Sequence, residues 1–295
     1  MPRQRLCILS RKKSLYSTSR LVEAAKEQGA QALVMDTLRC TLVVASGGNS
    51  LLYRGEEITS LAAAIPRIGT SITTYGMAVV SHLETMNVPV ANPAGAIARS
   101  RDKVRCLQLL AQAGVDVPRT VMATQGAKVR QLVDAVGGLP CIIKLLRGTQ
   151  GVGVMIANTR NEAETIVQTF WGLGQDVCLQ EFIIESRGRD VRALVVGDEV
   201  IGAMRRQAQG SEFRSNIHRG GEGKSIRLDK SYQETAVRAA KTIGLSVCGV
   251  DMLEGKSGPK VMELNSSPGF EGLEHATKKD IAGEIVRHAL ALKKK

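Results

Sequence analysis

The segment from residue 246 to 269, SVCGVDMLEGKSGPKVMELNSSPG, reads as two strands joined by a turn rich in glycine and proline. The two-residue period of a strand places Asp251 on one face of the first strand, and Glu263 and Asn265 on one face of the second. A turn centred near Ser257 sets Asp251 opposite Glu263. Two like charges in that position repel each other, and their apolar neighbours favour partial burial, so the pair indicates a cation between them.

The donor atoms of this segment indicate which cation. Two carboxylates and an amide carbonyl form a hard, all-oxygen set, which suits magnesium with nucleotide phosphates completing its shell. Metals that prefer thiolate or imidazole ligands are disfavoured. Taken alone, these residues are also consistent with an acidic hairpin that faces solvent.

A glycine-rich segment, CIIKLLRGTQGVGVMIA, lies between two further predicted strands. Gly148, Gly151 and Gly153 allow backbone N–H groups to approach an anion, and Lys144 lies on the entering strand. The spacing GxxGxG differs from the dinucleotide fingerprint, and a strand follows where that fingerprint needs a helix. The segment predicts a flap over nucleotide phosphates, although a surface hairpin with a chance lysine fits it equally well. Together with the carboxylate pair, it favours a nucleotide–metal site.

Strands and helices alternate along the chain, which favours an α/β domain at the N-terminus and an α+β architecture for the chain as a whole. We expect a strand at RLCILS, a helix capped by Ser17 or Ser19, and strands at QALVMD, AAAIPRIG and VPVANP, with this part ending near Asn92-Pro93. One helix is expected from about Ala98 to Ala113, stopped by Gly114. Another is expected near Gln233–Gly244, and a last one from about Ile281.

Composition narrows the class of protein. The chain has 295 residues, 43% of them hydrophobic, and its six scattered cysteines predict buried free thiols in a reducing compartment. No stretch is apolar enough for a signal peptide or a membrane span, so we expect a cytoplasmic protein. The net charge of +12 suits an anionic partner or only a solubility surface, and 3% aromatic residues argue against a stacking platform for single-stranded nucleic acid.

Several motifs now resemble a known family. Lys103 in RDKVRCLQLLAQAG, Lys144 with GTQGVGV, Gln180-Glu181 in LQEFI, and the Asp251, Glu263 and Asn265 set follow the order and spacing of ATP-grasp motifs. PRIGTSIT, EFRSNIHRGG and MELNSSPGFEG make the chain similar to the ribosomal protein glutamate ligase family, RimK, over nearly its whole length. The resemblance implies a pre-ATP-grasp α/β domain over residues 1–97 and an ATP-grasp domain over 98–295. Within the second domain, a small lobe over about 118–185 and a large lobe over about 186–295 clasp ATP.

The resemblance also implies roles for individual residues. Lys103, Lys144 and the glycines of the flap hold the phosphates, and Asp251, Glu263 and Asn265 bind two magnesium or manganese ions. The remaining nucleotide contacts are Glu181 and the Phe182 backbone at the adenine, Asp190 at the ribose, and Arg214, Ser215 and Asn216 along the nucleotide and substrate region. Arg192 and Arg206 are the candidates that grip substrate carboxylates, with Arg205 as an alternative to Arg206. Arg147 departs from the acidic or neutral residue expected before the flap.

The implied reaction joins a carboxylate to an amine. ATP phosphorylates the carboxylate, and the amine of glutamate attacks the resulting acylphosphate, without a side-chain nucleophile. The implied acceptor is the acidic C-terminal tail of a small-subunit ribosomal protein, handled by a homo-oligomer (dimer or tetramer) with no membrane or direct nucleic-acid role. An amino-group carrier protein or a small pterin- or deazaflavin-type cofactor is an alternative acceptor. A non-catalytic, basic ribosome- or RNA-binding protein is the alternative from another class.

Overall fold

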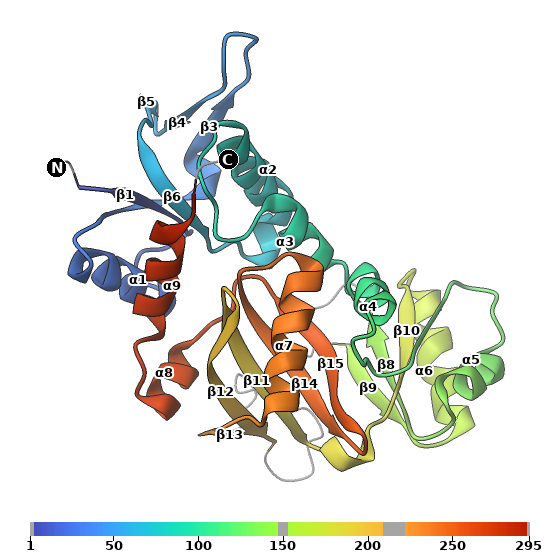
Figure 1. Ribbon diagram of the computed structural model, residues 1–295. Helices are drawn as coiled ribbons and strands as arrows, with labels where there is room; N and C mark the ends of the chain where they lie inside the picture. The colour runs from blue at the N-terminus through green and yellow to red at the C-terminus, as the bar shows by residue number, and fades with distance from the viewer. Residues whose placement is uncertain (1–2, 147–152, 209–221, 294–295) are drawn as a thin grey trace.

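The computed structural model describes residues 3–146, 153–208 and 222–293, and its first part is built on a parallel sheet. The strand order is β2-β1-β6, with β1 (Arg5–Leu9) paired parallel to β2 (Gln31–Met35) and to β6 (Leu61–Pro66). Helices α1 (Tyr16–Glu27), α2 (Thr73–Thr85) and α3 (Ala94–Arg101) accompany this sheet (Figure 1). Packing on both faces explains why RLCIL and LAAAIP read as almost continuous apolar runs.

Two expectations for this part are wrong. Neither Ser17 nor Ser19 caps the first helix, because α1 starts at Tyr16 after Leu15 and its N-cap makes no side-chain hydrogen bond. VPVANP forms only an isolated bridge between Val90 and Ala64, since Asn92 turns to bind the backbone of a distant strand instead. An antiparallel sheet of three short strands was not predicted from the sequence: β3 (Cys40–Val43), β4 (Ser50–Tyr53) and β5 (Glu56–Glu57).

The helix expected over residues 98–113 is two helices, α3 and α4 (Lys103–Gln112). Asp102 interrupts them in an extended conformation, and its carboxylate accepts a hydrogen bond of 3.0 Å from the Arg105 backbone. Aspartate is a preferred N-cap residue, so the second helix starts afresh there. Lys103 is therefore the first residue of a helix, not a side chain in the middle of one. The predicted stop is confirmed, since Gly114 follows the helix end with a φ of 69°.

The second sheet is antiparallel and small. Its order is β7 (Thr120–Ala123), β10 (Val177–Glu181), β8 (Cys141–Leu145) and β9 (Val154–Ala157). Helices α5 (Val129–Val136) and α6 (Arg160–Gly172) pack their apolar sides on it, around Ile143, Val167 and Leu179. Figure 1 shows this unit at one end of the molecule, beside α4.

The third sheet is antiparallel and carries the C-terminal part. Its order is β13 (Glu222–Ser225), β12 (Glu199–Gln207), β11 (Arg189–Val196), β14 (Val247–Gly255) and β15 (Gly258–Asn265). One face packs against α7 (Lys230–Ile243), which begins three residues before the expected start because Asp229 caps it. Short 3₁₀ turns at Thr37–Arg39, Thr70–Ile72 and Ile184–Ser186 complete the elements described up to β15.

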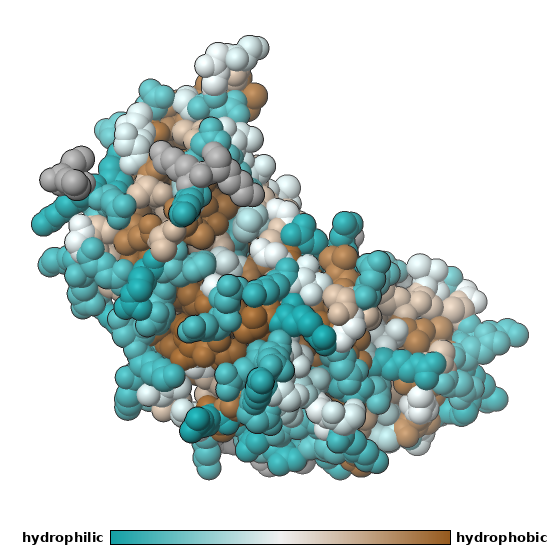
Figure 2. All heavy atoms as spheres, viewed as in Figure 1, coloured by the Kyte–Doolittle hydropathy of each residue, from teal (hydrophilic) through white to brown (hydrophobic). Residues whose placement is uncertain are grey.

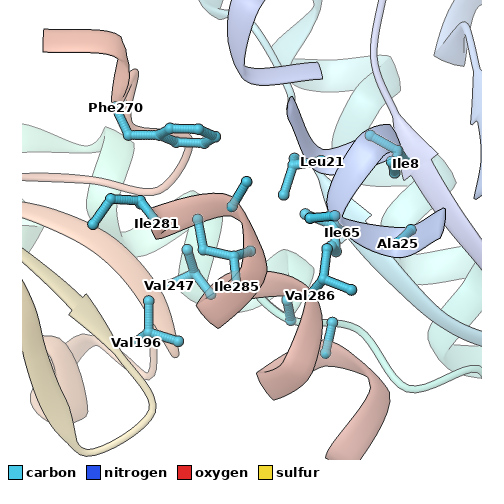
Figure 3. Packing of buried hydrophobic residues seen from close by; sticks show 14 of the residues in the cluster. Ile8, Leu21, Ala25, Ile65, Val196, Val247, Phe270, Ile281, Ile285 and Val286 are labelled. Atoms are coloured by element: carbon cyan, nitrogen blue, oxygen red, sulfur yellow. The ribbon is translucent and has the colours of Figure 1, made fainter. Parts of the chain in front are cut away.

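The opposite face of this third sheet changes character along its strands. Leu194 and Val196 on β11 join a cluster with α8 (Glu271–Thr277) and α9 (Ile281–Ala291), which also contacts α1 and β6. Figure 3 shows Ile285 and Val286 of α9 between Val196 and Val247 on one side and Leu21 and Ile65 on the other. The two C-terminal helices thus cover one half of the face and join it to the N-terminal sheet. The polar residues of β11 and β14 lie on the other half.

The surface is largely hydrophilic in the view of Figure 2, and the cysteines are buried as the sequence predicts. Figure 2 shows hydrophilic residues spread over one side of the molecule, with apolar areas between them. Among the described residues, no helix combines the length and apolar character needed to span a bilayer. All six cysteines are free and buried, as expected.

Candidate active site

The carboxylate hairpin forms with the predicted register. Asp251 on β14 pairs with Glu263 on β15, and Gly249 pairs with Asn265. The turn closes between Gly255 and Gly258, where the sequence places it, although a one-residue irregularity follows Asp251. The three donors predicted for magnesium therefore lie on the same half-face of the third sheet.

Two arginines from neighbouring strands complete that half-face. Arg192 is opposite Asp251, and its Nε and Nη2 donate to the two oxygens of Asp251 at 2.7 and 2.6 Å. Arg206 is opposite Asp190 and donates to both of its oxygens at 2.6 Å, while Nη2 also lies 3.1 Å from Asp251. Burial opposes ionisation of Asp251, but Arg192 and Arg206 outweigh it and lower its pKa to about 2.

This network decides between the two neighbouring arginine candidates. Arg205 lies on the other side of β12 and pairs with Glu254 at 2.6 Å, so Arg206 is the one at the site. Both Arg192 and Arg206 are held by protein carboxylates in this arrangement, and their role in gripping a substrate carboxylate stays a prediction. The same applies to Asp190 at the ribose, since its side chain is only 2% exposed and both its oxygens accept from Arg206.

Two lysines reach the carboxylates from other segments. Lys103 begins α4 and Lys144 lies on β8, yet both are close enough to Glu263 to influence its ionisation. Desolvation by the surrounding protein and the charge of Asp251 raise the pKa of Glu263. The positive charges of both lysines and of Arg192 oppose this rise but do not cancel it. Burial lowers the pKa of Lys144. The lysines of α4 and β8 therefore lie near the Glu263 carboxylate of β15.

Gln180 is a site residue whose role the sequence analysis missed. It is buried on β10, its Oε1 accepts from Lys144 Nζ at 2.5 Å, and its Nε2 donates to Thr120 at 2.8 Å. Gln180 thereby fixes the direction of the lysine. Its position beside Glu181 in LQEFI was the available signal, but the pairing of β10 with β8 is needed to see the contact.

The predicted adenine contacts lie at the end of the same strand. Glu181 accepts from the Arg119 backbone at 3.1 Å and lies 3.7 Å from Lys260, and Phe182 follows directly in the loop after β10. Their contact with a nucleotide stays a prediction. Arg147, Gly148, Gly151, Arg214, Ser215 and Asn216 lie outside the described residues.

The donor set fits a hard divalent cation. Asn265 donates to Asp251 through its amide nitrogen at 3.3 Å, which leaves its carbonyl oxygen, the atom that a cation takes, outside that bond. Over the described ranges, no three side chains of His, Cys, Asp or Glu gather as a complete metal cage. Two carboxylates and one amide therefore need oxygens from a bound phosphate to complete the shell, which is the usual arrangement for magnesium.

Gly153 closes the hairpin between β8 and β9 in a conformation that requires glycine. Its φ is 75°, and a Cβ there would lie 2.5 Å from Cδ1 and 3.1 Å from Cβ of Leu145. We expect Gly153→Ala to lower the free energy of unfolding by about 1–3 kcal/mol more than Gly174→Ala does, in urea denaturation. Gly174 is the matched control, because it has a φ of 67° and nothing within 4 Å of an added Cβ. Equal losses in the two variants would remove the steric argument.

Comparison with known proteins places the chain. Residues 4–97 match the RimK pre-ATP-grasp domain and residues 100–289 match the RimK-like ATP-grasp domain. A protein of Vibrio parahaemolyticus named probable alpha-L-glutamate ligase is 51% identical over 281 residues, which cover 95% of this chain and 93% of that protein. The ATP-grasp ligase PsnB with its minimal precursor has a TM-score of 0.78 at 27% identity, over 99% of both chains. PsnB with a phosphomimetic precursor variant, Mg and ADP has a TM-score of 0.77 at 25% identity, again over 99% of both. The chain has the ATP-grasp fold, belongs to the RimK-like ATP-grasp family and is an ATP-dependent ligase.

Proposed function

We propose that the protein adds glutamate to the acidic C-terminal tail of a small-subunit ribosomal protein. The observation that carries the ligase chemistry is the meeting of Lys103 and Lys144 with Glu263 beside Asp251. The glutamate assignment is supported by the relative named probable alpha-L-glutamate ligase, half identical over nearly the whole chain. The basic net charge of +12 suits a donor and a growing product that are both anionic.

The side chains of the site have separate tasks in this reaction. Asp251, Glu263 and Asn265 hold magnesium, which, when bound, supplies positive charge to phosphate oxygens, and PsnB with Mg and ADP supports its use here. Lys103 and Lys144 neutralise the phosphates of ATP, and Gln180 keeps Lys144 directed at them. Arg192 and Arg206 fix the orientation of Asp251. Rate enhancement then comes from positioning and charge neutralisation.

The proposed ligation has two steps, and neither step needs a side-chain nucleophile from the protein. The acceptor carboxylate takes the γ-phosphoryl group of ATP and ADP leaves. The glutamate nitrogen then forms a bond to the acyl carbon, inorganic phosphate leaves, and the nitrogen loses a proton. The buried free cysteines take no part, since their pKa values are raised by burial, as for Cys106.

An alternative acceptor, such as an amino-group carrier protein or a small cofactor, would use the same site. The non-catalytic alternative is not retained, because the chain belongs to a family of ATP-dependent ligases and keeps the predicted lysines and carboxylates of the site. Buried free thiols suit the cytoplasm, where we place the enzyme. A homo-oligomer (dimer or tetramer) and a pair of metal ions remain part of the proposal.

The test follows the mass of the acceptor. The protein is incubated with ATP, magnesium, glutamate and a small-subunit ribosomal protein with an acidic C-terminus, and intact-mass spectrometry is expected to show a ladder of glutamate additions. Lys144→Met is expected to abolish the ladder, and Lys224→Met, on β13, is the control that keeps it. Release of ADP that depends on glutamate, without a ladder, would retain the ligase and reject this acceptor. No turnover of ATP with any amine and acceptor would contradict the proposal.

A further inference from the structure

Arg67 is a cation whose partners do not balance its charge. It follows β6, and its Nη2 donates to Pro268 O at 2.7 Å and to Ser17 Oγ at 3.1 Å, while the guanidinium lies 5.7 Å from the ring centre of Phe270. None of these groups carries a negative charge, and no carboxylate in the described part of the chain pairs with it. Burial lowers the pKa of Arg67 to about 10. A desolvated guanidinium is expected to meet an anion.

Arg101, the last residue of α3, is a second arginine whose hydrogen-bond acceptors are all neutral. Its Nη1 donates to Gly69 O at 3.1 Å and to the Thr73 hydroxyl, and its Nη2 donates to Ile68 O. Burial lowers the pKa of Arg101 too. Both guanidinium groups thus bind neutral acceptors, whereas Arg192 and Arg206 each bind a carboxylate. Arg101 holds the loop by its backbone, whereas the Nε and Nη1 groups of Arg67 make no hydrogen bond with any residue that the structure describes.

The partner of Arg67 places it beside the candidate active site. Pro268 lies three residues after Asn265, and a Cβ added to Gly249 would be 3.2 Å from Pro268 Cβ and 3.8 Å from Arg192 Nε. The absence of a side chain at Gly249 therefore lets the Pro268 loop pack onto the sheet next to the Arg192–Asp251 pair. Arg67 brings the end of the N-terminal parallel sheet to the same loop. Ligands in open α/β sheets bind at the carboxyl ends of the strands, where Arg67 lies.

The loop after β15 contains a second polar group whose hydrogen-bonding capacity is not satisfied. The Oγ of Ser267 is buried and has no hydrogen-bond partner among the residues that the structure describes. A buried hydroxyl without a partner is uncommon, and a bound ligand is one way to satisfy it. Ser267 directly precedes Pro268, whose carbonyl accepts from Arg67, so the two groups belong to neighbouring positions of one loop.

We propose that Arg67 binds a substrate carboxylate at the junction of β6 and the loop after β15, with the Ser267 hydroxyl as a second donor. The inference rests on the proposed function and adds a residue outside the predicted set. The carboxylate belongs either to the free glutamate or to the acidic tail of the acceptor. Because Nη2 already donates to Pro268 and Ser17, the carboxylate is bound through Nη1 or Nε, and the charge of the guanidinium persists on burial, where a lysine ammonium readily loses its proton.

Steady-state kinetics of Arg67→Met and Arg67→Lys test the inference. Loss of one partner of a desolvated charge pair is expected to raise the KM for one carboxylate substrate by about 30-fold or more, with the KM for ATP changed less than about threefold. The lysine variant is expected to recover only part of the loss. Glutamate and the acceptor are varied separately, and the substrate whose KM rises is the one that Arg67 holds.

Arg99→Met is the matched control for a purely structural role. Arg99 also uses one guanidinium to bind a distant backbone carbonyl, that of Ile243, through Nε at 3.0 Å and Nη2 at 2.8 Å. It is expected to lower thermal stability without a selective change in either carboxylate KM. If Arg67→Met only lowers stability, or changes all kinetic constants alike, the inference is overturned while the glutamate ligase activity stands. If the wild-type protein incorporates no glutamate, the proposed function is wrong and the inference falls with it.

Discussion

Glu263→Gln is expected to lower kcat/KM by about a thousandfold, roughly 4 kcal/mol of transition-state stabilisation. The variant keeps the size of the side chain and removes the carboxylate charge that interacts with Lys103 and Lys144. Without that charge, the donor set for magnesium becomes one carboxylate and two amides, which binds the ion more weakly. The magnesium concentration that gives half of the maximal activity should therefore rise.

The fold is expected to tolerate this change. Glu263 makes no hydrogen bond or ion pair within the described ranges, so Tm should move by about 2 °C or less. Glu254→Gln is the control, since Glu254 lies on the same hairpin but pairs with Arg205 away from the site. Initial rates at several magnesium concentrations measure both variants. A loss of activity below tenfold for Glu263→Gln, or equal losses in the two variants, would show that Glu263 does not bind the ion.

Local rules were enough to predict the centre of the site. The alternation in VCGVDMLEG and GPKVMELN, with a tight turn between them, predicts that Asp251 and Glu263 lie close together, although their direct pairing also depends on the one-residue irregularity after Asp251. Local periodicity failed at Asp102, where an apolar pattern continues through a residue that caps a new helix. It failed again at Ser17 and Ser19, because helix α1 starts without a side-chain cap.

Contacts between distant segments could not be predicted in this way. Arg192 meets Asp251 only because β11 lies beside β14, and Arg206 reaches Asp190 only because β12 flanks β11 on the other side. The order of strands in a sheet depends on the packing of whole elements, so neither pair is visible in a motif. The bond from Arg67 to Pro268 joins residues 201 apart in sequence. These long-range contacts show that Arg192 and Arg206 both bind Asp251, which the sequence did not predict, while their predicted grip on a substrate carboxylate stays a prediction.

Arg206→Met is expected to lower the free energy of unfolding by about 3–5 kcal/mol, or Tm by about 10 °C. The Arg206 side chain is 4% exposed and neutralises Asp190, which is 2% exposed, and part of Asp251. Removal of one buried partner leaves an uncompensated charge, which costs more than the pair contributes. Arg205→Met is the control, because Arg205 is the adjacent residue in an ion pair whose arginine is 44% exposed, and it should cost about 1 kcal/mol or less. Similar Tm values for the two variants would contradict the role of Arg206.

The free energy of unfolding at low pH gives an independent check on the ion pairs between Asp251 and its two arginines. The pKa of Asp251 is lowered from 3.8 to about 2 in the folded protein, so its ionic contribution is complete above about pH 4 and is lost as pH falls through about 2. Without Arg206, Arg192 alone opposes the effect of burial, and the pKa of Asp251 should rise. The loss of stability in acid should then be smaller in Arg206→Met and should end at a higher pH than in the wild-type protein, because the pH at which it begins is set by the unfolded state. Urea denaturation between pH 2 and pH 6 measures the shift, and parallel pH profiles for the two proteins would mean that Arg206 does not hold the charge of Asp251.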